Sequence, residues 1–285
     1  MLIVPERLAV ACRDVPERSE WLARLPDTVR GLEVGWSLAL TPLDSADASC
    51  SWVAFAQLRD GTRAVLKLGI PHMEAEHEIH GLRFWNGDGI IRLLDADEDL
   101  NAMLLERCEP GTPLRAVPED EQDVVIARLL RRLWQKPRPP HPFRPLSSML
   151  GYWASETRAS ADKWLDRGLV NDGLRVFEEL SRPSDDDVLL ATDLHAGNVL
   201  RAQRDGWLAI DPKPFVGDRA YDATQHLLNC TPRVIASIDS TISRFADLLE
   251  IEVERVRLWM FARAAAEPRD VWNEESVAFA KAFRI

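Results

Sequence analysis

The sequence ATDLHAGNVL at residues 191–200, followed by WLAIDP at residues 207–212, decides the fold prediction. It places two carboxylates and one amide at short separations, in Asp193, Asn198 and Asp211. Phosphoryl transfer to a hydroxyl needs these groups, because one carboxylate orients and deprotonates the acceptor while an Asn oxygen and a second carboxylate are hard ligands for Mg²⁺. The pattern therefore favours this chemistry.

On the N-terminal side of this stretch, short apolar segments separated by turns predict an antiparallel sheet. The sequence RDGT at residues 59–62 has the Asp-Gly pair of a tight hairpin turn. A helix is predicted over residues 74–85, since Ile79, Leu82 and Trp85 recur three residues apart. The five predicted strands span residues 36–40, 52–58, 64–68, 90–94 and 102–107.

The rest of the chain is predicted to be mostly helical. The sequence EPGTP at residues 109–113 is typical of a linker between lobes. Beyond it the apolar residues follow helical spacing, as in Ile126, Leu129, Leu130, Leu133 and Trp134. We therefore predict a bilobal α+β fold, with an N-terminal lobe over residues 1–108 and a helical C-terminal lobe over residues 109–285.

Taken in chain order, several motifs resemble the aminoglycoside phosphotransferase branch of the protein-kinase-like fold. Within that branch, the chain is similar to the streptomycin 6-phosphotransferase and hydroxyurea phosphotransferase family. The separation of Asp193 and Asn198 is that of a kinase catalytic loop. The matching pieces cover nearly the whole chain: AVLKLG (64–69), EAEHEIHGLRFW (74–85), GDGIIRLLDAD (87–97), LLERCEPGTPL (104–114), DLHAGNVL (193–200) and WLAIDPKPFVGDRAYD (207–222).

For the C-terminal lobe, the resemblance implies that Asp193 is the base or orienting group for the acceptor hydroxyl, and that Asn198 and Asp211 bind Mg²⁺. One departure concerns the support of this loop. The family usually has His-Gly before the catalytic aspartate, whereas this chain has Ala191-Thr192. The histidine that commonly braces the loop is therefore absent.

For the N-terminal lobe, the resemblance implies that ATP binds there. Lys67 would hold the α- and β-phosphates and form an ion pair with a helix carboxylate. Glu78 is the predicted partner, because Leu82 and Trp85 then stand at +4 and +7, where the family places apolar residues. Glu74, one helical turn earlier, is the rival.

Two further segments are implied to contact the nucleotide. The small residues around Ser49 and Ser51 resemble the family's loop over the triphosphate, where backbone N–H groups approach the phosphate oxygens. The stretch from Glu106 to Cys108 resembles the hinge whose main chain hydrogen-bonds the adenine. No glycine-rich GxGxxG motif is present in the sequence.

Neighbouring polar residues are interpreted as structural. His195 is predicted to be a hydrogen-bonded structural histidine, since phosphoryl transfer needs no second base. Lys213 would either contact a phosphate or pair with Asp218, and the pairing is the favoured interpretation. Asp218 and Asp222 are predicted to cap and brace the helix that follows them, and not to bind metal.

Composition narrows the class of partner. The 35 Lys plus Arg residues against 46 Asp plus Glu give a formal net charge of −11, which disfavours a nucleic-acid partner. The four cysteines lie far apart without a CxxC pair, which excludes a zinc cluster or a dense disulfide framework. No apolar run is long enough for a signal peptide or a membrane span, so we predict a cytoplasmic protein with no membrane partner. The sequence makes no prediction of oligomeric state.

The sequence thus predicts an ATP- and Mg²⁺-dependent phosphotransferase that acts on a small-molecule hydroxyl. By resemblance, an aminoglycoside such as streptomycin is the first acceptor to consider, and hydroxyurea, a sugar or another hydroxylated metabolite are alternatives. Two other hypotheses stay open. One is a nucleotide-binding pseudokinase, suggested by Ala191-Thr192, and the other is a metal hydrolase using Asp193, His195 and Asp211.

Overall fold

The computed structural model describes residues 2–43 and 50–284, and the chain folds into two compact units. Unit 1 comprises Met1–Gly111 together with Ala202–Gly206, and unit 2 comprises Thr112–Arg201 together with Trp207–Ile285. The short segment Ala202–Gly206, from the second half of the chain, therefore belongs to unit 1. The sequence had predicted one lobe boundary after residue 108 and no such segment.

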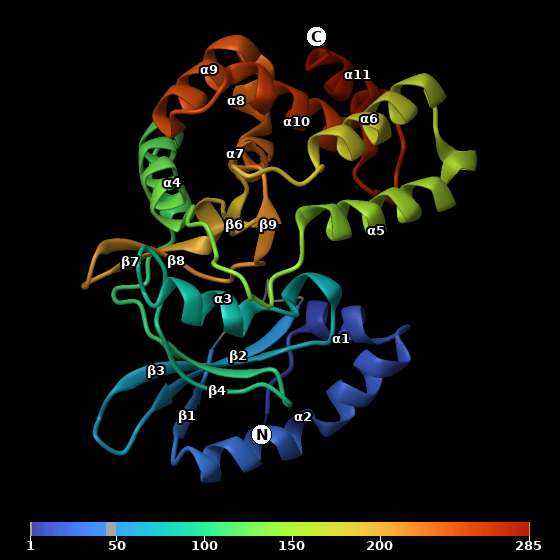
Figure 1. Ribbon diagram of the computed structural model, residues 1–285. Helices are drawn as coiled ribbons and strands as arrows, with labels where there is room; N and C mark the ends of the chain where they lie inside the picture. The colour runs from blue at the N-terminus through green and yellow to red at the C-terminus, as the bar shows by residue number, and fades with distance from the viewer. Residues whose placement is uncertain (1, 44–49, 285) are drawn as a thin grey trace. The chain divides into compact units, whose positions relative to one another are not determined.

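Unit 1 is built on a five-stranded antiparallel sheet with strand order β1-β2-β3-β5-β4 (Figure 1). A 3₁₀ turn at Met73–Ala75 precedes the helix α3, which begins at Glu78 and not at residue 74. The elements are α1 (Glu6–Cys12), α2 (Pro16–Gly35), β1 (Ala39–Pro42), β2 (Ser51–Gln57), β3 (Arg63–Gly69), α3 (Glu78–Trp85), β4 (Leu93–Asp97) and β5 (Ala102–Glu106).

Strand periodicity assigns the side chains of this sheet to two faces. Leu66 and Leu68 on β3 are fully buried in the same apolar cluster as Leu8 of α1 and Leu25 of α2. Successive side chains of a strand point to opposite faces, so Lys67 lies on the face away from that cluster. The alternation thus keeps one charged side chain clear of the apolar core.

The helices α1 and α2 were not predicted. Residue Pro26 lies inside α2, and a proline within a helical pattern is read as a break because it removes a backbone donor. The remaining apolar residues of α2 recur often enough to bury Leu25, Val29 and Leu32 against the sheet. Tertiary packing therefore stabilises a helix that local pattern did not indicate.

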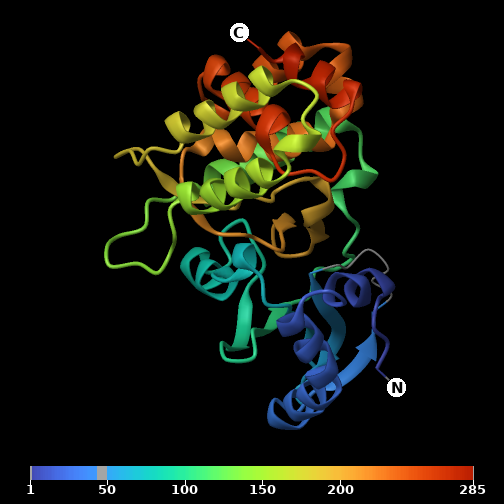
Figure 2. The same cartoon turned by 90° about the vertical axis from the view of Figure 1, so that its right-hand side faces the viewer.

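Unit 2 is mostly helical, as expected, with four short strands (Figures 1 and 2). The helices α6 and α10 approach closely at Gly173, where an added Cβ would lie 2.7 Å from the Cβ of Ala265. The elements are α4 (Glu119–Leu133), α5 (Leu146–Ala159), α6 (Arg167–Leu180), β6 (Val188–Leu190), β7 (Val199–Ala202), β8 (Gly206–Ala209), β9 (Phe215–Gly217), α7 (Arg219–Asn229), α8 (Thr231–Ala236), α9 (Ile238–Leu249), α10 (Val253–Ala266) and α11 (Glu274–Ala282).

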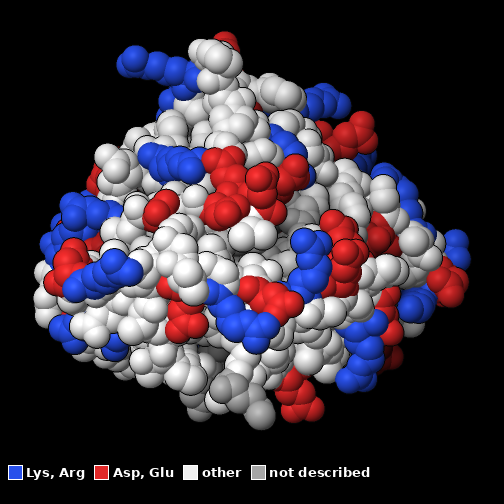
Figure 3. All heavy atoms as spheres, turned by 90° about the horizontal axis from the view of Figure 1, so that it is seen from below, with Lys and Arg blue, Asp and Glu red and all other residues white. Residues whose placement is uncertain are grey.

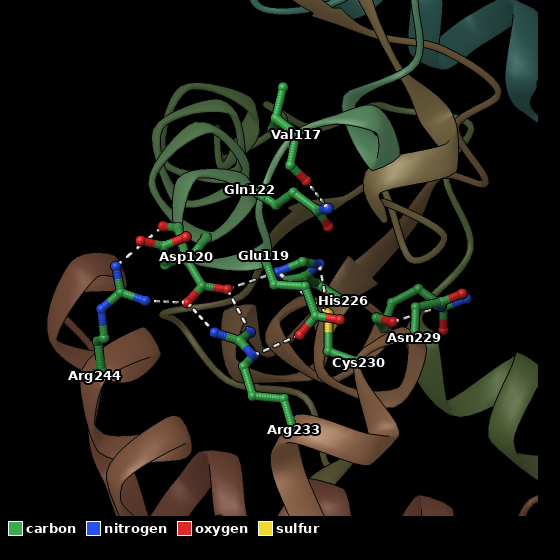
Figure 4. A network of polar contacts seen from close by, with 11 residues as sticks. Val117, Glu119, Asp120, Gln122, His226, Asn229, Cys230, Arg233 and Arg244 are labelled. Carbon is green, nitrogen blue, oxygen red and sulfur yellow. Dashed lines mark hydrogen bonds and ion pairs between the residues drawn. The ribbon is translucent and has the colours of Figure 1, made fainter.

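A buried polar network fastens α7 to α4, α8 and α9 (Figure 4). Asp123 of α4 is fully buried and accepts from His226 Nε2 at 2.8 Å. Both terminal nitrogens of Arg233 donate to it at 2.7 Å, and Arg244 donates at 2.6 Å. Burial alone raises the pKa of Asp123, but these hydrogen bonds and charges bring its net pKa below the ordinary value. The network holds α7 in place, and Gln225 of the same helix donates to Asp193.

On the face drawn in Figure 3, basic and acidic side chains are intermixed and do not segregate by sign. Exposed pairs such as Arg24–Glu20 at 3.5 Å contribute little to stability. In the described part of the chain, no helix is both long and apolar enough to cross a membrane.

Candidate active site

Lys67 and Glu78 form a buried ion pair in unit 1. Lys67 Nζ lies 2.6 Å from Oε1 and 2.7 Å from Oε2 of Glu78, and the two residues are 7% and 2% exposed. The cation comes from the centre of β3 and the carboxylate from the first turn of α3. Of the two carboxylates that the sequence left open, Glu78 is therefore the one that forms this ion pair with Lys67.

The predicted hinge at the end of β5 has a side chain already engaged. Arg204 donates to Oε1 and Oε2 of Glu106 at 3.0 Å, and the backbone N–H of Arg92 donates to Oε2 at 2.9 Å. Burial raises the pKa of Glu106, but these bonds lower it to a net value below the ordinary one. The Glu106 N–H donates to the carbonyl of Arg92 at 2.9 Å. Both the side chain and the N–H of Glu106 are therefore engaged by other residues of unit 1.

Cys108 and Ser51 complete the residues predicted for nucleotide binding. Burial raises the pKa of the Cys108 thiol to about 12, so this side chain stays protonated and unreactive at neutral pH. Ser51 begins β2 and is half-buried. Ser49 lies outside the described residues.

In unit 2, the loop before Asp193 is held by a buried carboxylate on α7. Asp222 accepts from the backbone N–H of Ala191 at 3.1 Å and of Thr192 at 2.8 Å, and from the indole of Trp134 at 3.0 Å. Burial raises the pKa of Asp222 to about 6, and the three hydrogen bonds act in the opposite direction. Asp222 therefore holds the backbone of the loop in which the family's usual histidine is missing. The sequence had predicted that it braces its own helix.

Thr192 has an unusual backbone conformation. Its φ is +51°, in the left-handed region that β-branched residues rarely adopt. The Thr192 hydroxyl donates to the carbonyl of Lys213 at 2.6 Å, in addition to the bond from its N–H to Asp222. The glycine of the usual His-Gly pair would adopt this φ without strain, and here two side-chain hydrogen bonds hold the threonine instead.

The carboxylate of Asp193 is held from two sides. Gln225 Nε2 of α7 donates to Oδ1 at 2.7 Å, and Lys213 Nζ forms an ion pair with Oδ2. Asn198 Nδ2 donates to the Asp193 carbonyl at 3.0 Å, so its amide oxygen is turned away from that bond. Lys213 therefore pairs with Asp193, and the prediction that it pairs with Asp218 was wrong. Asp218 instead caps α7 through the N–H of Ala220.

His195 has a structural role, as its ring accepts from the backbone N–H of Gly197 at 3.1 Å. Burial lowers the pKa of His195, which keeps the ring neutral and able to accept. A Cβ at Gly197 would lie 2.7 Å from the ring. The glycine therefore permits the close approach of the His195 ring to the backbone of this turn.

Backbone hydrogen bonds bring the Asp211 segment beside this loop. The N–H of Ile210 donates to the Asn198 carbonyl at 2.9 Å, and the N–H of Lys213 donates to the Ala191 carbonyl at 2.9 Å. Asp211 lies between these two bonds, with φ +54°. Strained backbone of this kind clusters at functional sites, and here it is set by bonds on either side.

The donor set around this loop fits Mg²⁺. Among residues 2–43 and 50–284, no group of three or more His, Cys, Asp or Glu forms a candidate metal cluster. Asn198 and Asp211 would instead supply one amide oxygen and one carboxylate. Such a sparse oxygen set is typical of Mg²⁺, which keeps several waters and takes substrate phosphate oxygens as ligands.

Sequence reasoning missed Gln225 and misassigned Lys213 and Asp222. Along the chain, Gln225 lies 32 residues from Asp193, Lys213 lies 20 and Asp222 lies 29. Gln225 and Lys213 contact the Asp193 carboxylate directly. Helical spacing offered one signal for Gln225, since it stands three residues after Asp222 on the same helix. Nothing in the local sequence indicated which face of α7 meets the loop.

Comparison with known proteins identifies the family of this chain. The family model described as aminoglycoside/hydroxyurea antibiotic resistance kinase matches residues 19–276. A streptomycin 6-kinase of Streptomyces glaucescens is 38% identical, covering 91% of this chain and 88% of its own. A hydroxyurea phosphotransferase of Kitasatospora aureofaciens is 33% identical, covering 72% of this chain and 61% of its own.

The fold is that of the protein-kinase-like enzymes. The choline kinase LicA from Streptococcus pneumoniae superposes with a TM-score of 0.61 at 12% identity, covering 91% of this chain and 97% of that chain. Similarity in sequence extends over the lysine strand, the loop with Asp193 and the segment with Asp211, since the matched span contains all three. The chain therefore belongs to the aminoglycoside/hydroxyurea antibiotic resistance kinase family.

Proposed function

We propose that this protein transfers the γ-phosphate of ATP to a hydroxyl of a small molecule, with an aminoglycoside such as streptomycin as the first candidate acceptor. The observation that carries the proposal is the convergence of Asp193, Asn198 and the Asp211 segment through the backbone bonds of one loop. The streptomycin 6-kinase relative supports the choice of acceptor. The hydroxyurea phosphotransferase relative makes hydroxyurea the second candidate.

Each residue has a separate role in the proposed reaction. Lys67, held by Glu78, would bind phosphate oxygens of ATP. Asn198 and Asp211 would hold Mg²⁺, which neutralises the phosphate charge when bound. These assignments rest on the buried cation in unit 1 and on the oxygen donors beside the loop in unit 2.

Asp193 would act on the acceptor. Its carboxylate would accept a hydrogen bond from the acceptor hydroxyl and take that proton as the oxygen attacks the γ-phosphorus and the bond to the ADP oxygen breaks. Gln225 and Lys213 would orient the carboxylate, and Asp222 would hold the backbone that carries it. Catalysis would come mainly from positioning and charge neutralisation.

The test is a screen for acceptor-dependent ADP release with Mg-ATP, over streptomycin, other aminoglycosides, hydroxyurea and sugars, with mass detection of the phosphorylated product. We expect Asp193→Asn to lower kcat by roughly 10²- to 10⁴-fold, the usual value of a general base, while Mg-ATP binding persists. A pseudokinase would bind Mg-ATP without product for any acceptor. A metal hydrolase would release phosphate with no acceptor and would tolerate Lys67→Met.

A further inference from the structure

Arg204 stands in the turn between β7 and β8 and makes four hydrogen bonds within unit 1. Its Nε donates to Oε1 of Glu106 and its Nη2 donates to Oε2, both at 3.0 Å. Its Nη1 donates to the Gly87 carbonyl at 2.7 Å, and Nη2 also donates to the Ile90 carbonyl at 2.9 Å. We call Arg204, Glu106, Gly87 and Ile90 the Arg204 clamp. It joins the end of β5 to the loop that follows α3.

The clamp is shielded and reinforced by its surroundings. The side chains of Arg204 and Glu106 are 24% and 20% exposed, so their bidentate contact is better protected from water and salt than an exposed surface pair. The Glu106 carboxylate also accepts from the N–H of Arg92 at 2.9 Å. Gly87 has φ +82°, which glycine adopts without strain, and a Cβ there would lie 2.7 Å from Arg92 Cγ. A glycine therefore suits the position that presents this carbonyl to Arg204.

The clamped segments adjoin the residues proposed to bind the nucleotide in unit 1. The predicted hinge, whose main chain would hydrogen-bond the adenine, begins at Glu106. The loop with Gly87 and Ile90 follows α3, whose first residue Glu78 forms the ion pair with Lys67. A segment that must become ordered when a ligand binds lowers the affinity, whereas a segment that is held beforehand does not. The clamp therefore orders the hinge before the nucleotide arrives.

The hairpin that carries Arg204 also connects to the proposed Mg²⁺ ligands along the chain. Asn198 directly precedes β7, and Asp211 follows the last residue of β8 by two positions. The N–H of Ile210 donates to the Asn198 carbonyl at 2.9 Å and closes the base of this hairpin. One hairpin thus has both proposed metal ligands at its base and the hinge-binding arginine at its tip.

We propose that Arg204 is a positioning residue for nucleotide binding, which holds Glu106 and the loop after α3 so that the hinge is ready to receive the adenine. The inference rests on the proposed function and adds to it a residue that lies 98 positions from Glu106 along the chain. Arg204 acts through the hinge and not by contact with the nucleotide. Its loss therefore weakens binding of Mg-ATP and leaves binding of the acceptor unchanged.

The test compares Arg204→Met with wild type in calorimetric titrations with Mg-ATP and in steady-state kinetics with streptomycin as acceptor. The Kd and KM for Mg-ATP rise roughly 10-fold, the low end of the effect of losing a hydrogen bond between charged groups. The KM for streptomycin and the kcat at saturating ATP stay unchanged, because only ground-state binding of the nucleotide is lost. Arg204→Lys keeps the charge but not the planar fork, so its Kd for Mg-ATP lies between the two.

Two further variants separate the clamp from a general effect of charge or stability. Arg201→Met is the matched control, because Arg201 is an exposed arginine of the same hairpin whose guanidinium lies over the Trp207 ring. It leaves the Kd for Mg-ATP unchanged. Glu106→Gln raises this Kd as Arg204→Met does, and the double variant is no weaker than either single variant, because both substitutions break one contact.

Several results would overturn the inference. They are an unchanged Kd for Mg-ATP in Arg204→Met and Arg204→Lys, an equal rise in the KM for streptomycin, additive effects of Arg204→Met and Glu106→Gln, and the same effect in Arg201→Met. Arg204→Lys decides the matter by itself if Arg204→Met does not fold. Failure of the proposed function is a separate result, in which wild type binds Mg-ATP but phosphorylates no acceptor, since calorimetry tests the clamp without turnover. Wild type that binds no Mg-ATP would overturn both.

Discussion

The buried pair Lys67–Glu78 gives the sharpest quantitative prediction. The residues are 7% and 2% exposed, and Nζ contacts both carboxylate oxygens within 2.7 Å. Replacing either partner with methionine breaks the buried ion pair, which costs about 3–5 kcal/mol. Replacing both removes the two charges together, and such exchanges are often neutral or stabilising by about 1–4 kcal/mol. We therefore expect the double substitution to be more stable than the sum of the two single effects predicts by at least about 6 kcal/mol.

The assay is urea unfolding of wild type, Lys67→Met, Glu78→Met and the double variant, with kinase activity measured in parallel. All three variants should lose activity by at least about 10²-fold, as expected for loss of a preorganised charge in the site, although the double variant recovers stability. Glu74→Gln is the control for the rival carboxylate. Additive single effects would refute the coupling, and an active double variant would refute the phosphate-binding role of Lys67.

Three further predictions concern unit 2. Lys213→Met should lower kcat roughly 10- to 100-fold through loss of a charge-assisted contact to Asp193, and an unchanged kcat in steady-state assays would contradict the orienting role. Thr192→Gly should change the free energy of unfolding by no more than about 1 kcal/mol, because relief of the backbone strain offsets the lost hydrogen bond of the hydroxyl. Thr192→Val keeps the backbone strain and loses the same hydrogen bond. Chemical denaturation should therefore find Thr192→Val less stable than Thr192→Gly. Asp123→Asn should cost about 3–5 kcal/mol at pH 7, since it removes the buried negative charge that Arg233 and Arg244 bond. Folding lowers the pKa of Asp123. The stabilisation by its charge is therefore complete above the unfolded pKa of about 3.9 and is lost as the pH falls through the folded pKa. In urea unfolding, the difference in free energy of unfolding between wild type and Asp123→Asn should narrow below about pH 4, and a difference that widens there would contradict this prediction.

The architecture was largely predictable because it depends on local periodicity. Alternation of buried side chains on β2 and helical spacing on α4 are properties of neighbouring residues, and both elements were found. The helix α2 was missed, since its interior Pro26 is locally unfavourable and only packing of Leu25 on the sheet compensates. Element ends such as the start of α3 at Glu78 were also displaced.

By itself, the sequence determined the chemical class of the site. Asp193, Asn198 and Asp211 are close enough in the chain that the identity and spacing of the side chains already favour phosphoryl transfer. Only the tertiary structure decided which residues support them. Asp222, Gln225 and Lys213 contact the loop across 20 or more residues of chain. Such contacts depend on how helices pack, and helix packing is set by the shape of the whole core, which no short stretch of sequence contains.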